Sequence, residues 1–85
     1  MSLEDKFKKA CQQLRDFTKR PPEADLLELY ALYKQANEGD VNKPKPNDAE
    51  SKKKWDAWSG KKGINKDAAK QAYVNKINSI AGTYT

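Results

Sequence analysis

The chain has 85 residues, of which 17 are basic and 12 acidic, so its formal net charge is +5. This length is typical of one domain, expected over residues 1–85, and leaves no room for a second. Histidine is absent and there is one cysteine, which excludes Ser-His-Asp and Cys-His catalytic sites, a zinc site of His and Cys ligands, and an internal disulfide. The lack of histidine argues against catalysis without eliminating it.

The sequence contains no signal for export or for a membrane span. Its longest apolar stretch runs from Leu29 to Tyr33, far short of the roughly 20 residues that cross a bilayer. The N-terminal residues MSLEDKFKK lack the apolar run of a signal peptide. We therefore expect a cytoplasmic protein, with a monomer as the simplest state.

Residues 3–17 form the first segment with helical periodicity. Ser2 is a suitable N-cap, and Glu4 and Asp5 suit the positive end of the helix dipole. Prolines at 21 and 22 follow the segment and end it. One predicted buried stripe follows the spacing of three and four residues: Leu3, Phe7, Ala10, Cys11, Leu14 and Phe17.

The second predicted helix covers residues 23–37, with acidic residues at its start and Gly39 at its end. Its predicted core face comprises Leu26, Leu29, Tyr30 and Tyr33. A long loop over residues 38–47 follows and contains Pro44 and Pro46.

The third predicted helix covers residues 48–59, with Asn47 or Asp48 as its cap and Gly60 and Gly63 at its end. The fourth covers residues 66–81, capped by Asn65 and closed by Gly82. Its stripe comprises Ala69, Ala72, Tyr73, Ile77 and Ile80. No segment shows strand-like alternation, so the sequence predicts an all-α fold, a four-helix bundle with a long Pro-containing loop between helices two and three.

The basic charge is unevenly distributed along the chain. Residues 21–40 carry one basic and five acidic side chains. A protein that binds nucleic acid through its phosphate backbone would not usually carry such an acidic helix. The charge pattern therefore favours a protein that binds a compact polyphosphate ligand. A small basic module that binds nucleic acid or a membrane surface remains the alternative.

Two groups of residues permit both a structural and a functional interpretation. Lys52-Lys53-Lys54-Trp55 is either a solvated helix face beside a core Trp or a phosphate site. Tyr30 and Lys34 lie one helical turn apart, so they fit either the core stripe or a site with a ring for a base and an ammonium for a phosphate. Tyr73 has the same ambiguity.

Two longer motifs favour the functional interpretation. The run from Tyr30 to Asn42 reads YALYKQANEGDVN and is similar to YxxYKQAxxGDxN of the acyl-CoA-binding proteins. The residues KWDAW from Lys54, followed by Lys62-Gly63 and Ala72-Tyr73, resemble the second block of that family. The resemblance covers nearly the whole chain. It implies a four-helix bundle that binds long-chain acyl-CoA, needs no cofactor or metal, and does no chemistry on its ligand.

The resemblance also implies a role for each matching residue. Tyr30 would contact the adenine, and Lys34 and Lys54 would contact phosphates, above all the ribose 3′-phosphate. Tyr73 would offer its hydroxyl to the same phosphate and its ring to the nucleotide pocket. Arg15 stands where the family commonly has a basic residue near the ligand.

Other matching positions are expected to serve the fold, namely Gln35, Trp55 and Trp58. Tyr33 shares that expectation, and its place in the motif also makes it a candidate ligand contact. The chain departs from the family pattern in a loop about two residues shorter before Trp55 and in Lys61, where the family usually has an apolar residue. These departures affect the expected chain-length preference more than the ligand class.

Overall fold

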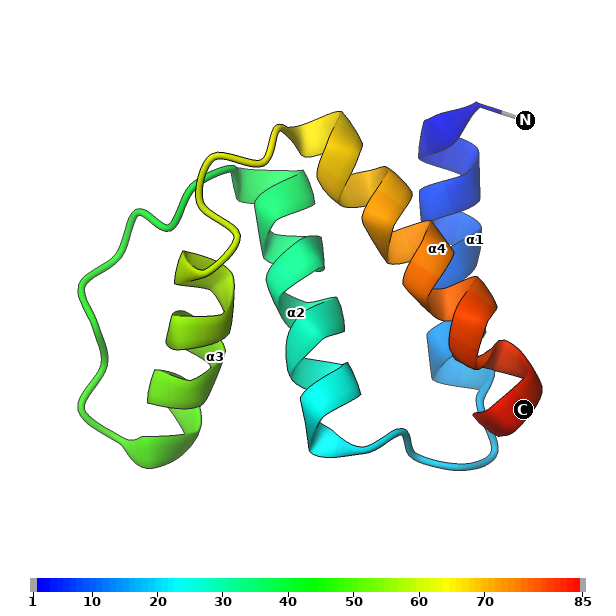
Figure 1. Ribbon diagram of the computed structural model, residues 1–85, viewed down its shortest axis with the longest axis horizontal. Coiled ribbons are helices and arrows are strands. Elements are labelled where there is room, and N and C mark those ends of the chain that lie inside the picture. Colours follow the sequence, from blue (N-terminus) through cyan, green and yellow to red (C-terminus); the bar gives the residue numbers. More distant parts are fainter. Residues whose placement is uncertain (1, 85) are drawn as a thin grey trace.

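The computed structural model describes residues 2–84, so the first and last residues of the expected domain lie outside the described residues. It contains four helices, α1 (Leu3–Asp16), α2 (Glu23–Glu38), α3 (Ala49–Ser59) and α4 (Lys66–Tyr84) (Figure 1). Within residues 2–84 there is no strand. The predicted all-α four-helix fold is confirmed, and the helix bounds lie within one residue of the predicted ones except at the end of α4.

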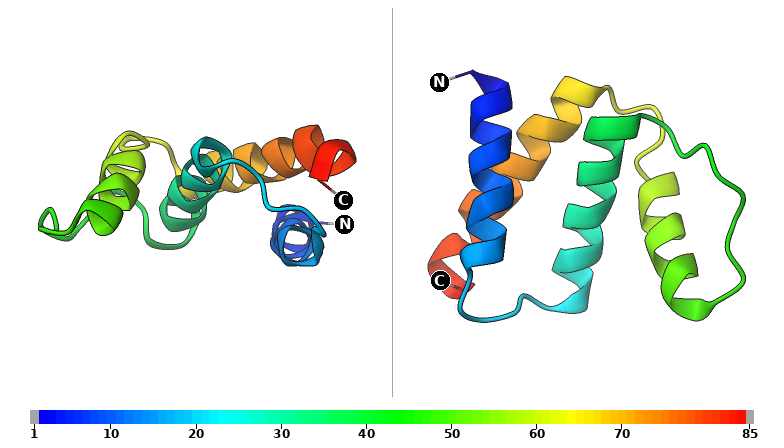
Figure 2. Two further views of the ribbon diagram at one scale, coloured as in Figure 1. Left: turned by 90° about the horizontal axis from the view of Figure 1, so that it is seen from below. Right: turned by 180° about the vertical axis from the view of Figure 1, so that it is seen from behind.

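The helices form a flat molecule. α2 packs against both α3 and α4, and α1 packs against α4. Figure 2 shows α3, α2 and α4 arranged in one layer, with α1 beside this layer next to α4. The molecule measures 35 × 28 × 15 Å. The shortest of these Cα extents corresponds to two helices in depth at most, which leaves little space for an enclosed cavity.

Three helices begin with the side-chain caps that the sequence predicts. The Ser2 hydroxyl accepts a hydrogen bond from the Asp5 amide at 3.1 Å. The Asp48 carboxylate accepts one from the Ser51 amide at 2.9 Å, and the Asn65 side chain accepts one from the Ala68 amide at 2.7 Å. These bonds satisfy amides that lack a partner within their own helix.

The predicted end of α4 at Gly82 is wrong. The helix continues through Gly82 to residue 84, and Gly82 does not have the positive φ of a glycine that terminates a helix. Glycine permits a left-handed cap without imposing one. The sequence after residue 81 contains no proline to stop the helix, so the chain keeps its helical hydrogen bonds.

The core is built from one face each of α1, α2 and α4, and its aromatic centre is the edge-to-face contact of Phe7 with Tyr73 at 5.1 Å between centroids. The predicted face of α2 needs correction, because Leu32 is buried and Tyr33 is 41% exposed. α2 has neighbours on two sides, so its buried surface is wider than one stripe. The buried residues of this cluster are Phe7, Ala10, Leu29, Leu32, Ala36, Ala69, Tyr73, Val74, Ile77 and Ile80, and Ala31 and Trp58 are also buried.

The segment after α2 is fixed by polar contacts. The buried Gln35 amide donates to the Asp40 carboxylate and to the Ile64 carbonyl, both at 2.8 Å. The Trp58 indole donates to the Gly39 carbonyl at 2.9 Å, and the Trp55 indole donates to the Lys43 carbonyl at 2.8 Å. Gln35 and both tryptophans therefore have the structural contacts expected of them.

Candidate binding site

A tyrosine and two lysines meet where α2 faces α3. The Lys34 ammonium lies 6.0 Å from the centre of the Tyr30 ring, and the Lys54 ammonium lies 5.6 Å from the same ring. Lys34 also lies 5.6 Å from the Trp58 ring. Tyr30 and Lys34 are one turn apart on α2, whereas Lys54 comes from α3, so the packing of these helices creates the cluster. It places two positive charges beside one half-exposed aromatic ring.

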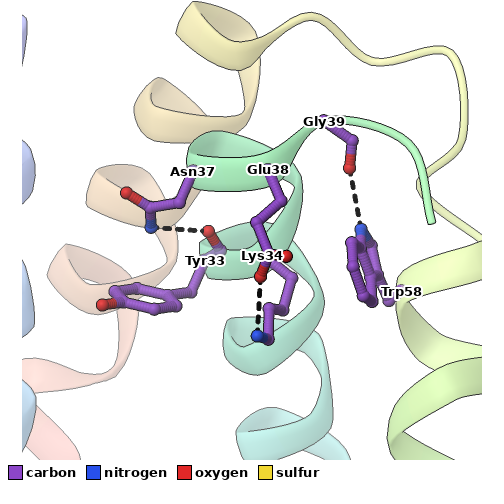
Figure 3. A network of polar contacts seen from close by, with 6 residues as sticks. All are labelled: Tyr33, Lys34, Asn37, Glu38, Gly39 and Trp58. Atoms are coloured by element: carbon purple, nitrogen blue, oxygen red, sulfur yellow. Dashed lines mark hydrogen bonds and ion pairs between the residues drawn. The ribbon is translucent and has the colours of Figure 1, made fainter. Parts of the chain in front are cut away.

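Lys34 also forms an ion pair with Glu38, the last residue of α2. The ammonium nitrogen and a carboxylate oxygen are 2.7 Å apart (Figure 3). This hydrogen bond raises the pKa of Lys34 and lowers the pKa of Glu38, so both groups are charged at neutral pH. In Figure 3 the Tyr33 ring extends away from Lys34. The backbone carbonyl of Tyr33 accepts a hydrogen bond from the Asn37 side chain at 2.8 Å.

A groove of about 260 Å³ adjoins the cluster between α1 and α2. Tyr73 of α4 is 3% exposed and forms the floor, and burial, with the neighbouring Cys11 thiol, raises the pKa of its phenol. The groove is aromatic and aliphatic apart from one guanidinium and one thiol. Its lining comprises Cys11, Leu14, Arg15, Leu26, Leu29, Tyr30, Tyr33 and Tyr73.

A second hollow of about 300 Å³ lies on the α3 side of Tyr30. It shares Leu26 and Tyr30 with the groove, and its charged side chains are Arg20, Lys54, Glu23 and Glu50. Tyr30 therefore stands between an apolar groove and a charged hollow. With the Lys34 and Lys54 ammonium groups beside its ring, Tyr30 suits a ligand with an anionic, aromatic end and an apolar end.

A larger hollow has a different character. It measures about 540 Å³ between α1 and α4 and uses the face of α1 opposite the groove. Its lining includes Lys6 and Lys9 but no aromatic ring, and most of its other residues carry carboxamides. Size alone therefore does not identify the site, because this hollow has no aromatic ring for a base and carboxamides interrupt its apolar surface.

All six candidate residues lie at the groove or in the cluster around Tyr30. The groove contains Arg15, Tyr30, Tyr33 and Tyr73, and the two lysines flank Tyr30. Sequence reasoning assigned Cys11, Leu14 and Leu26 to the core alone, whereas they line the groove. It also missed Glu38, although its position four residues after Lys34 is a signal for an ion pair.

Lys61, one of the two departures from the family pattern, also has a partner. Its ammonium lies 2.7 Å from the Glu28 carboxylate of α2, and its side chain is 22% exposed. The substitution of a lysine for an apolar residue thus adds an ion pair between α2 and the segment after α3. No helix over residues 2–84 has both the length and the apolar character needed to cross a membrane.

Comparison with known proteins identifies the family. The sequence model described as Acyl CoA binding protein matches residues 4–77. The chain belongs to the acyl-CoA-binding protein family. An acyl-CoA-binding protein homolog of Manduca sexta is 43% identical over 83 residues, which cover 94% of this chain and 92% of the relative. An acyl-CoA-binding protein homolog of Drosophila melanogaster is 37% identical over 84 residues, which cover 96% of this chain and 98% of the relative.

Solved structures of acyl-CoA-binding proteins share the fold. Acyl-CoA-Binding Protein 2 of Oryza sativa superimposes with a TM-score of 0.91 at 29% identity, over 95% of this chain and 92% of the other. ACBP from Moniliophthora perniciosa gives a TM-score of 0.85 at 38% identity, over 98% and 86%. The family predicted from the two motifs is confirmed, and it is a family of binding proteins.

Proposed function

We propose that this protein binds long-chain acyl-CoA with its nucleotide end at Tyr30, Lys34 and Lys54 and its acyl tail in the apolar groove. The observation that supports this proposal is the position of Tyr30. Its ring lines the apolar groove and also lies 6.0 and 5.6 Å from the Lys34 and Lys54 ammonium groups. A ligand with a fatty tail and a phosphorylated nucleotide matches both surfaces at once.

Each candidate residue has a proposed contact. The Tyr30 ring stacks near the adenine, and Lys34 and Lys54 bind phosphates, chiefly the ribose 3′-phosphate. Tyr73 offers its hydroxyl to that phosphate from the groove floor. Arg15 and Tyr33 line the groove wall, where a guanidinium and a phenol can each donate to ligand oxygens.

The energetics permit tight binding. Burial of most of a sixteen-carbon tail contributes on the order of 10 kcal/mol at about 0.8 kcal/mol per methylene. Each charge-assisted hydrogen bond to a phosphate adds roughly 1.5–3 kcal/mol. Association and ordering cost about 4–15 kcal/mol. The balance reaches nanomolar affinity, about −12 kcal/mol.

The physiological role that fits this site is that of a carrier. One domain over residues 1–85 keeps the thioester in the groove, shielded from water by the nucleotide, and releases it to enzymes that use acyl-CoA. We propose that the protein acts in the cytoplasm as a monomer, makes transient contacts with membranes or such enzymes, and performs no catalysis. The alternative of a small nucleic-acid- or membrane-surface-binding module is not favoured, because the site combines apolar and cationic surfaces.

Isothermal titration calorimetry with palmitoyl-CoA, CoA and palmitate tests the proposal. Palmitoyl-CoA should bind most tightly, because CoA loses the tail contribution and palmitate loses the phosphate contacts. Equal affinity for all three ligands would contradict the division between a nucleotide region and a tail region. Affinity for nucleic acid without an acyl chain, falling steeply with salt, would favour the alternative.

A further inference from the structure

The Glu38 carboxylate pairs with the Lys34 ammonium, the group that the proposed function assigns to a ligand phosphate. Its carboxylate lies 2.7 Å from the Lys34 nitrogen. The two side chains are 24% and 33% exposed, so water only partly screens the pair. Both carry charge at neutral pH, since the hydrogen bond lowers the pKa of Glu38. A phosphate that reaches Lys34 therefore meets a carboxylate already bound there.

The helix itself gains little from this carboxylate. Glu38 is the last residue of α2, at the negative end of the helix dipole. The last turn of α2 contains no basic residue. An acidic side chain is unfavourable at this end of a helix. The order Lys then Glu, four residues later, is also the weaker orientation for an ion pair within a helix. The main effect of Glu38 is therefore on Lys34.

We propose that Glu38 acts as an internal competitor for the ligand: it holds the Lys34 ammonium in the free protein and weakens the binding of acyl-CoA. This inference rests on the proposed function of Lys34 as a phosphate contact. A bound phosphate replaces the carboxylate on the ammonium and repels it, because two anions then lie beside one cation. Affinity is set by the difference between the phosphate contact and the ion pair that it displaces.

Glu38→Gln tests the proposal, because glutamine keeps the shape and the acceptor oxygen and removes the charge. We expect palmitoyl-CoA and CoA to bind roughly three- to tenfold more tightly to this variant, given the modest strength of a partly exposed ion pair and the lost repulsion. Calorimetry at one fixed salt concentration measures the change. Palmitate, which carries no phosphate, should bind both proteins equally.

Glu28→Gln is the matched control. Glu28 also lies on α2 and also pairs with a lysine at 2.7 Å, but that lysine, Lys61, lies outside the cluster around Tyr30. The control changes the net charge by the same amount as Glu38→Gln. An affinity gain of similar size in Glu28→Gln would show a general charge effect and overturn the proposal.

A double variant tests whether Glu38 acts on affinity through Lys34. Glu38→Gln should give a clearly smaller gain when Lys34→Ala is already present, because the ion pair is then absent and only the repulsion between the carboxylate and the phosphate is relieved. An unchanged or weaker affinity of Glu38→Gln, with tight binding by the unaltered protein, would overturn the competitor role and leave the proposed function intact. Absence of acyl-CoA binding by the unaltered protein would overturn both.

Discussion

The Lys54 side chain approaches Tyr30 from a different helix than Lys34 does, and it forms no ion pair over residues 2–84. Its distance of 5.6 Å from the ring centre is near the outer limit of a cation–π contact, which contributes only about 0.5–1 kcal/mol at an exposed site. Its charge therefore remains available to a ligand. Lys34, by contrast, must leave Glu38 first.

Lys54→Ala should weaken the binding of palmitoyl-CoA by roughly tenfold or more, the loss of one charge-assisted hydrogen bond to phosphate. Lys34→Ala should weaken it by less, because the phosphate contact of Lys34 replaces an ion pair with Glu38. Calorimetry measures the affinity, and circular dichroism should show unchanged helix content. Lys52→Ala is the control, since Lys52 belongs to the same run but lies on another face of α3. Loss of helix content in either site variant would favour a structural role.

Tyr73→Phe isolates the contribution of one hydroxyl. The ring packs against Phe7 and would keep that contact, while the groove floor would lose its polar atom. We expect the affinity for palmitoyl-CoA to fall several-fold, as for the loss of a hydrogen bond, with a smaller effect on palmitate. An unchanged affinity for palmitoyl-CoA would remove Tyr73 from the phosphate contacts.

The connection between α2 and α3 depends on Gly39 as well as on the side chains that anchor it. Gly39 has φ 82° and ψ −152°, a region essentially restricted to glycine. An added methyl group would have space, because its nearest neighbour would be 3.8 Å away. Any loss of stability on substitution therefore comes from backbone strain.

Gly39→Ala should lower the free energy of unfolding by roughly 1–3 kcal/mol. Gly82→Ala, within the helical conformation of α4 and with open space around it, should raise it by about 0.5–1 kcal/mol. Urea denaturation followed by circular dichroism compares the two. Equal effects would contradict the assignment of strain to Gly39 and of helix to Gly82.

Asp40 links the end of α2 to the turn before α4, and this link gives a pH dependence. The Gly63 amide and then the Gln35 amide donate to its carboxylate and lower its pKa from the ordinary value of 3.8. Because the folded pKa is the lower one, the stabilisation is fully present well above pH 3.8 and is lost as the pH falls through the folded value.

Asp40→Asn should therefore destabilise the protein at pH 7 and have a smaller effect near pH 3. Urea denaturation of both proteins at the two pH values measures the difference in the free energy of unfolding. A difference that stays constant, or that grows in acid, would show that the Asp40 charge does not stabilise the fold.

Helix positions and caps are predictable because they depend on residues close together in the sequence. Ser2, Asp48 and Asn65 cap the helices they precede. The core face of α2 is less predictable, since burial of Leu32 and exposure of Tyr33 follow from neighbours on two sides. Such neighbours are set by the packing of distant segments.

The molecule as a whole is too thin to enclose a long acyl chain. Its Cα positions span 15 Å in the shortest direction, which corresponds to two helices in depth at most. A chain of sixteen carbons must then lie along the surface, in the groove between α1 and α2, as we propose. In this arrangement the nucleotide shields the exposed side of the tail from water.

Only some of the residues of the candidate site are predictable from the sequence alone. The pair Tyr30 and Lys34 follows from helical spacing, whereas the proposed role of Lys54 rests on resemblance to the family. The residues that line the groove beside them are not predictable in this way, because Cys11, Leu14 and Leu26 have the spacing of core positions. Periodicity identifies an apolar face without showing whether another helix covers it.

The most direct test of the account is a crystal structure of the protein with palmitoyl-CoA bound. We predict phosphates at Lys34 and Lys54, the adenine against Tyr30, and the acyl chain in the groove over Tyr73. A ligand bound instead in the larger hollow between α1 and α4, beside Lys6 and Lys9, would contradict the account.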